Sequence, residues 1–257
     1  LVILLWGLLF AFASSAQEAA APEPPALPDL ASLQQNWWGY FEGSPDDVQS
    51  RADAFLEEAS RQIPALGPTS QELAADNLEA VRDNLRVYLS LLGDPGIESS
   101  QLPEPAPVYT VDELLETAAR SREARGQADD AQLEVEREQR VLSGAARRRD
   151  AAFKDYLNAA AGDQRWLAGL QLVRVRASQA ISARRLEILR QSARSTSEYA
   201  EALAARVNLS IERLAPGTET DLLERLAAAV AGAAHVDLLA ALLRVAQGQG
   251  LRRADRQ

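Results

Sequence analysis

Apolar positions recur at helical spacing along most of this chain. Apolar side chains follow one another in steps of three or four residues from Val48 to Ala59, which places them on one helix face. Ser44 and Pro45 before them form a typical helix start, because serine caps the first turn and proline fits the first helical position. A second helix is predicted to begin at a capping box, with Thr69 as its cap, and to end at Leu92. We expect residues 45–92 to form an antiparallel helix pair.

Two much longer helices are predicted in the second half of the chain. Thr110 and Glu113 form a capping box, and only isolated glycines interrupt the helical pattern before Gly162. A second pattern runs from residue 164 to about residue 214. Helices of about 50 residues extend about 75 Å each. Because the turn between them is short, they are predicted to form a long antiparallel helical hairpin.

The apolar seam of this hairpin is weak, because charged residues occupy two expected core positions. These are Glu138 and Arg149, both in the first arm. The predicted seam consists of Ala128, Ala131, Val135, Leu142, Ala145, Phe153 and Tyr156 in the first arm and Leu170, Val173, Ala177, Ile181 and Ile188 in the second. Such a seam needs cover from other helices or from copies of the chain. A largely apolar helix from Asp221 to about residue 247 is one candidate, and we expect it to be buried rather than inserted in a membrane, since Asp237 is costly in lipid.

Proline-rich stretches divide this all-α chain into parts. Residues 17–29 and 101–109 are predicted linkers. Residues 30–100 form a small acidic helical subdomain, which opens with a short helix from residue 30 to the aromatic cluster at residues 37–41. Residues 110–247 comprise the long helical hairpin and its covering helix, and residues 248–257 form a loose tail.

Residues 1–16 resemble a secretory signal peptide that is truncated at its start. An apolar run from Leu1 to Ala13 precedes the small residues Ser14 to Ala16, which suit a cleavage site. We therefore expect an exported, periplasmic protein. The chain has no cysteine, so it is not a disulfide scaffold.

The distribution of charge excludes some classes of partner. Residues 17–110 carry 16 acidic and 4 basic side chains, whereas residues 111–214 carry 16 acidic and 18 basic ones. Binding to nucleic acid requires a basic face, and docking on anionic lipid requires the same, so the acidic half is suited to neither.

No pattern of catalytic or metal-binding residues stands out. His235 is the single histidine and cysteine is absent, which excludes a multi-histidine zinc site and a Cys-His pair. We expect no cofactor and no bound metal, and we expect that the chain is not an enzyme. Paired carboxylates such as Asp46 and Asp47 fit helix caps or solvated faces.

Two clusters are candidates for an interaction surface. The first is aromatic and consists of Trp37, Trp38, Tyr40 and Phe41. It is interpreted either as a plug that packs onto the helix pair or as a contact with a membrane interface or a cell-wall glycan. The second consists of Arg147, Arg148 and Arg149, which are either solvated and paired with nearby acids or contact a partner or lipid headgroup.

The order of these parts, with the aromatic box Trp37-Trp38-Gly39-Tyr40-Phe41, resembles the periplasmic N-terminal extension of large mechanosensitive channels of the MscS-like superfamily. The resemblance covers residues 30–214. It implies a sensing or bracing role in the periplasm, tethered to the inner membrane through a pore portion that is missing from this chain. It also implies self-association or contact with other helical envelope proteins. The alternative is a freestanding periplasmic adaptor or scaffold of an envelope or efflux assembly.

Overall fold

The computed structural model describes residues 25–34, 36–94 and 102–215, together with residues 217, 218, 221 and 224. Its elements, in chain order, are η1 (Trp37–Phe41), α1 (Pro45–Gln62), η2 (Ile63–Ala65), α2 (Pro68–Leu92), α3 (Val111–Asn158) and α4 (Asp163–Glu212). The all-α prediction is confirmed. The predicted signal peptide, most of the first linker, nearly all of the covering helix with His235, and the tail lie outside the described residues.

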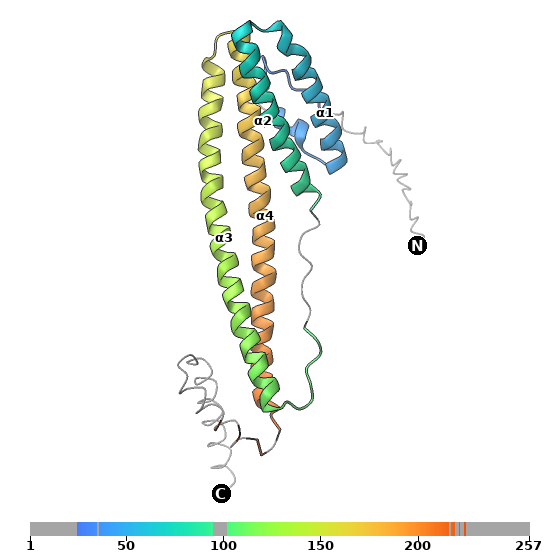
Figure 1. Ribbon diagram of the computed structural model, residues 1–257, viewed down its shortest axis with the longest axis vertical. Coiled ribbons are helices and arrows are strands. Elements are labelled where there is room, and N and C mark those ends of the chain that lie inside the picture. Colours follow the sequence, from blue (N-terminus) through green and yellow to red (C-terminus); the bar gives the residue numbers. More distant parts are fainter. Residues whose placement is uncertain are drawn as a thin grey trace, which may run out of the picture.

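The long antiparallel hairpin is confirmed by α3 and α4, which contain 48 and 50 residues and pack against each other along their length (Figure 1). The turn between them lies at the upper end in Figure 1, where Gly162 has a positive φ of 83°. At the lower end α3 begins with the predicted capping box, in which the Thr110 side chain accepts from the Glu113 N–H. Both ends of the arms therefore lie close to the predicted residues.

The small unit of η1, α1 and α2 packs beside the upper part of α4 (Figure 1). Successive contacts run down both helices: Arg174 Nη1 donates to Asn77 Oδ1 at 3.0 Å, and Arg184 Nε donates to the Leu91 carbonyl at 3.1 Å. Helices α2 and α4 are therefore parallel. The cover that the weak seam requires comes, on this face, from α2.

Two predicted helix starts in the small unit are wrong. Helix α2 begins at Pro68 with Gly67 as its N-cap, so Thr69 lies inside the helix. The Gly67 N–H donates to Asp163 Oδ2 at 2.7 Å, and this carboxylate from α4 does what a local capping side chain does elsewhere.

The predicted helix from residue 30 is also absent, since only η1 is helical there. Asp29 accepts hydrogen bonds from Ala31 N–H and Ser32 Oγ, and the Leu33 N–H donates to Tyr156 Oη at 2.7 Å. Side-chain acceptors of this kind compete with helical hydrogen bonds. The segment forms a turn and crosses α4 at Gly169, where an added Cβ would lie 2.2 Å from the Leu30 carbonyl oxygen.

The predicted seam is partly wrong because α4 is apolar on two faces. Four predicted seam residues pack in one core with α1, α2 and η1, namely Leu170, Val173, Ala177 and Ile181. The buried residues of α4 that cluster with α3 are Leu172, Leu186, Ala193, Ala200 and Leu203. In α3, Phe153 is 42% exposed, and Ala152 is the buried residue beside Tyr156. A helix between two neighbours needs two apolar stripes, whereas the predicted seam has one.

The lower end of the hairpin is closed by backbone pairing. Tyr109 N–H donates to the Arg213 carbonyl, and Ala215 N–H donates to the Tyr109 carbonyl, each at 3.0 Å. These bonds form an isolated parallel bridge between Tyr109 and Leu214. Just before it, the Ala106 carbonyl accepts from Arg213 Nη1 at 3.1 Å. The segment that enters α3 is thus fixed to the segment that leaves α4.

Replacing Glu138 with leucine is expected to stabilise the hairpin by about 1–3 kcal/mol. Glu138 lies one turn from both Val135 and Leu142, which pack with α4, and its Oε1 is buried without a hydrogen-bond partner among the described residues. Leucine removes that unsatisfied oxygen and adds apolar area. Thermal unfolding measures the gain, and Glu136→Leu, at an exposed position on the same helix, is the control. An unfolding midpoint of Glu138→Leu at or below that of the parent chain would contradict the prediction.

The capping box is expected to stabilise α3 in a pH-dependent way. The N–H and hydroxyl of Thr110 donate to the Glu113 carboxylate at 2.8 and 3.0 Å, and they lower the pKa of that carboxyl. A lowered pKa stabilises the fold above the ordinary pKa of glutamate, and this contribution is lost as the pH falls through the lowered value. The difference in unfolding midpoint between the parent chain and Glu113→Gln should therefore be present at neutral pH and vanish in acid. A difference that stays constant with pH would contradict it.

Candidate functional site

Three of the four predicted aromatic site residues belong to the core. Phe41 is fully buried, with its ring 5.4 Å from that of Phe55, and Trp38 lies 5.1 Å from Phe41 and 6.0 Å from Tyr88. Tyr40 is buried as well. Because η1 is enclosed by α1, α2 and α4, successive rings are covered on different sides. The plug interpretation accounts for the burial of these three residues.

The tyrosine hydroxyls of this core are not poised for proton transfer. Burial raises the pKa of Tyr40, which the nearby Arg51 only partly offsets. Burial also raises the pKa of Tyr88, and the charge of Glu42 raises it further. Both phenols therefore stay protonated at neutral pH, as expected for structural residues.

The three consecutive arginines point to different surroundings. Arg147 and Arg148 are exposed, whereas Arg149 is half-buried. Arg148 lines a groove beside α2 together with Asn84 and Arg174. Arg149 lines a separate cleft on the side of η1. Successive helical residues are about 100° apart around the axis, so consecutive arginines lie on different surfaces.

The cleft at Arg149 is the place where the two predicted clusters meet. It has a volume of about 470 Å³ and lies where η1 faces α3 and α4. We call it the aromatic–arginine cleft, and it is lined by Asn36, Trp37, Trp38, Gly39, Glu42, Arg149, Asp150, Phe153, Leu172 and Arg176. The structure thus joins Trp37, Trp38 and Arg149, and leaves Tyr40, Phe41, Arg147 and Arg148 elsewhere.

Two important lining residues were not predicted as site residues. Arg176 is one of many arginines on α4, and no spacing distinguishes it from the others. Phe153 was expected in the seam of the hairpin, but its exposed ring lies at the cleft instead. Both residues become lining residues because η1 lies across the hairpin, and this placement has no local signal in the sequence.

Arg176 is held in the cleft as a half-buried cation. Its guanidinium lies 5.1 Å from the centre of the Trp38 ring and donates from Nη1 to Gln179 Oε1 at 2.8 Å. Loss of hydration lowers the pKa of Arg176, and the positive charge of Arg149 lowers it further, while Glu42 acts in the opposite direction. An arginine keeps its charge through such shifts, so the cleft contains two cations in one small space.

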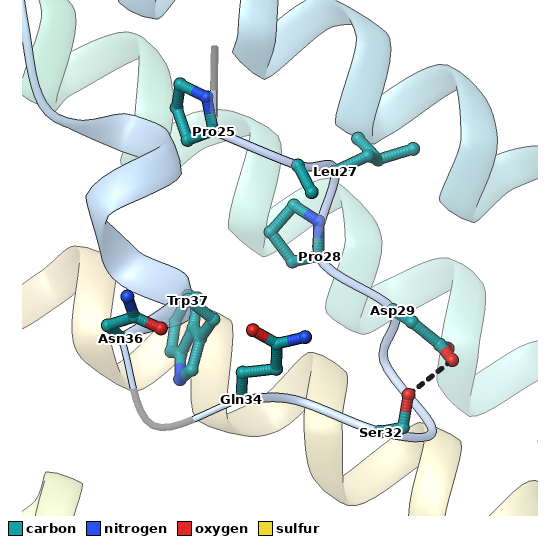
Figure 2. A pocket seen from close by; sticks show the side chains of 9 residues that line it. Pro25, Leu27, Pro28, Asp29, Ser32, Gln34, Asn36 and Trp37 are labelled. Atoms are coloured by element: carbon teal, nitrogen blue, oxygen red, sulfur yellow. Dashed lines mark hydrogen bonds between the residues drawn. The ribbon is translucent and has the colours of Figure 1, made fainter. Parts of the chain in front are cut away.

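A smaller recess lies on the other side of Trp37. The chain loops around it from Pro25 through Ser32 to Trp37 (Figure 2), and its volume is about 200 Å³. Asn36 and Trp37 line both this recess and the aromatic–arginine cleft. Trp37 is only partly buried and so presents its ring to the surroundings on this side of the molecule.

Comparison with known proteins finds no relative of this chain. No family model, curated protein or solved structure matches the chain. Within residues 25–34, 36–94 and 102–215, no cluster of three or more histidine, cysteine, aspartate or glutamate side chains is arranged to hold a metal ion. No helix in that part of the chain has the length and apolar character needed to span a membrane.

Proposed function

We propose that this chain is a non-catalytic periplasmic sensor or scaffold region of a mechanosensitive ion channel protein of the MscS-like superfamily. The proposal rests on the resemblance in the order of elements and on the aromatic box. The observation that carries it is the long hairpin, which is braced by α2 at its upper end and closed by the bridge between Tyr109 and Leu214 at its lower end.

This geometry suits a part that transmits or resists displacement. A helix of 48 residues extends about 72 Å, and its backbone hydrogen bonds make it stiff along its axis. Side-chain bonds from Arg174 and Arg184 tie α2 to α4 over the upper part of this length. A displacement of the small unit therefore moves the rod rather than a loose linker.

The test uses the complete reading frame that contains this chain. We expect it to encode membrane-spanning helices beyond residue 257 and, in bacterial cells that lack their own mechanosensitive channels, to give tension-gated currents and survival of hypo-osmotic shock. Gly169→Ala, which disturbs the crossing of the Leu30 segment over α4, should shift the tension threshold. Gly126→Ala on α3, where an added Cβ meets nothing within 4 Å, should leave the threshold unchanged. A reading frame without membrane-spanning helices would overturn the proposal.

That outcome would favour the alternative, a freestanding helical adaptor or scaffold of an envelope assembly. Efflux adaptors flank a helical hairpin with β-rich domains. The described residues of this chain contain an isolated bridge at Tyr109 and Leu214 but no strand, which counts against an efflux adaptor of that type.

A further inference from the structure

We propose that the aromatic–arginine cleft binds an acidic sugar, that is, a sugar ring that carries a carboxylate. This inference depends on the cleft alone and not on the channel proposal. The cleft combines two cations, accessible aromatic rings and acidic side chains.

The two arginines provide a site for an anion. The ion pairs found among the described residues include none with Arg176, which remains half-buried between the Trp38 ring and Gln179. Arg149 shares the cleft and forms an ion pair with its neighbour Asp150 at 2.5 Å. An anion between the guanidiniums relieves the repulsion of two like charges, and a carboxylate matches the planar fork of an arginine.

The aromatic residues provide a surface for a ring. Trp37 is partly buried, Phe153 is 42% exposed, and both line the cleft beside Leu172. The faces of aromatic rings favour flat apolar surfaces, such as the C–H face of a sugar. A volume of about 470 Å³ lies within the usual range for small-molecule sites and holds one or two sugar rings.

The acidic side chains distinguish a sugar from other anions. Glu42 and Asp150 line the same cleft as Arg149 and Arg176. Carboxylates accept hydrogen bonds from hydroxyl groups, but they repel a multiply charged phosphate or a dense anionic lipid surface. A ligand with one negative charge and several hydroxyl groups can bind the arginines through its charge and donate hydrogen bonds to the carboxylates through its hydroxyl groups. An acidic sugar has this composition.

The experiment compares two sugars that differ by one carboxylate-bearing group. N-acetylmuramic acid has a lactyl carboxylate that N-acetylglucosamine lacks. Each is titrated into the full chain up to about 20 mM, and binding is followed by the NMR signals of the tryptophan indole N–H groups and by calorimetry. We expect N-acetylmuramic acid to bind with a dissociation constant in the millimolar range and to shift the Trp37 signal, which Trp37→Phe identifies.

Neighbouring arginines supply matched variants. Arg149→Gln and Arg176→Gln should each weaken binding about tenfold, because each removes a charged donor to the ligand. Arg148→Gln removes the same charge from the next position but faces the groove beside α2, and it should change the affinity less than about twofold. Unchanged unfolding midpoints would show that the variants are folded.

Several results would overturn the inference. These are equal binding of both sugars, no binding at the highest concentration, or equal effects of Arg148→Gln and Arg149→Gln. Binding of inorganic phosphate or of vesicles rich in anionic phospholipid, without binding of N-acetylmuramic acid, would assign the cleft to a phosphate group or a membrane surface instead.

Discussion

Replacing Phe41 with alanine is expected to lower the free energy of unfolding by about 3–5 kcal/mol. Phe41 is fully buried and its ring contacts those of Trp38, Tyr40 and Phe55. Alanine removes this apolar area and leaves a cavity that the surrounding rings cannot fill without leaving their own contacts. Denaturant unfolding, followed by tryptophan fluorescence for the small unit and by far-ultraviolet circular dichroism for the helices, measures the loss.

Phe153→Ala is the matched control for this prediction. The same side chain is removed, but Phe153 is 42% exposed on α3, so we expect a loss of less than about 1 kcal/mol. Equal losses for the two variants would contradict the assignment of Phe41 to the core. They would also reopen the possibility that η1 presents its rings to a partner.

Replacing Gly169 with alanine is expected to destabilise the protein by about 2–3 kcal/mol, although alanine favours helix. An added Cβ would lie 2.2 Å from the Leu30 carbonyl oxygen and 3.0 Å from its carbonyl carbon. Since these are backbone atoms, the Leu30 segment must move away, and the buried Leu30 side chain leaves the core. The Leu33 N–H then loses Tyr156 Oη as its acceptor.

The control for Gly169 is the glycine at position 126. Gly126 lies in α3, and an added Cβ there meets nothing within 4 Å, so Gly126→Ala should stabilise the protein by about 0.5–1 kcal/mol. Thermal unfolding compares the two variants, and limited proteolysis near residue 30 detects release of the segment. Stabilisation by Gly169→Ala, or unchanged proteolysis, would show that the segment does not cross α4 so closely.

The long helices could be predicted because their signals are local. The capping box at Thr110 and the break at Gly162 depend on residues that are close in sequence. The start of α2 could not be predicted in the same way, because the acceptor for its first N–H is Asp163, on another helix. Likewise, the turn after Asp29 depends partly on Tyr156, more than 100 residues away.

The candidate site was predictable only in part, for a related reason. The sequence marks Trp37 and Arg149 as unusual, one by its aromatic neighbours and the other by its basic neighbours. It does not show that they meet, because that depends on where η1 crosses the hairpin. Arg176 has no local signal at all, and its role follows from the ring of Trp38 beneath it.

The bridge between Tyr109 and Leu214 makes the hairpin a spacer of adjustable length. The segment that enters α3 and the segment that leaves α4 meet at this bridge. Among the described residues, the lowest hydrogen bond between the small unit and α4 joins Leu91 to Arg184. Below that residue, removing or adding one heptad in each arm changes the distance between the docked unit and the bridge by about 10 Å and keeps the register of the seam. Related proteins could therefore match different distances through paired changes in α3 and α4 while the small unit stays the same.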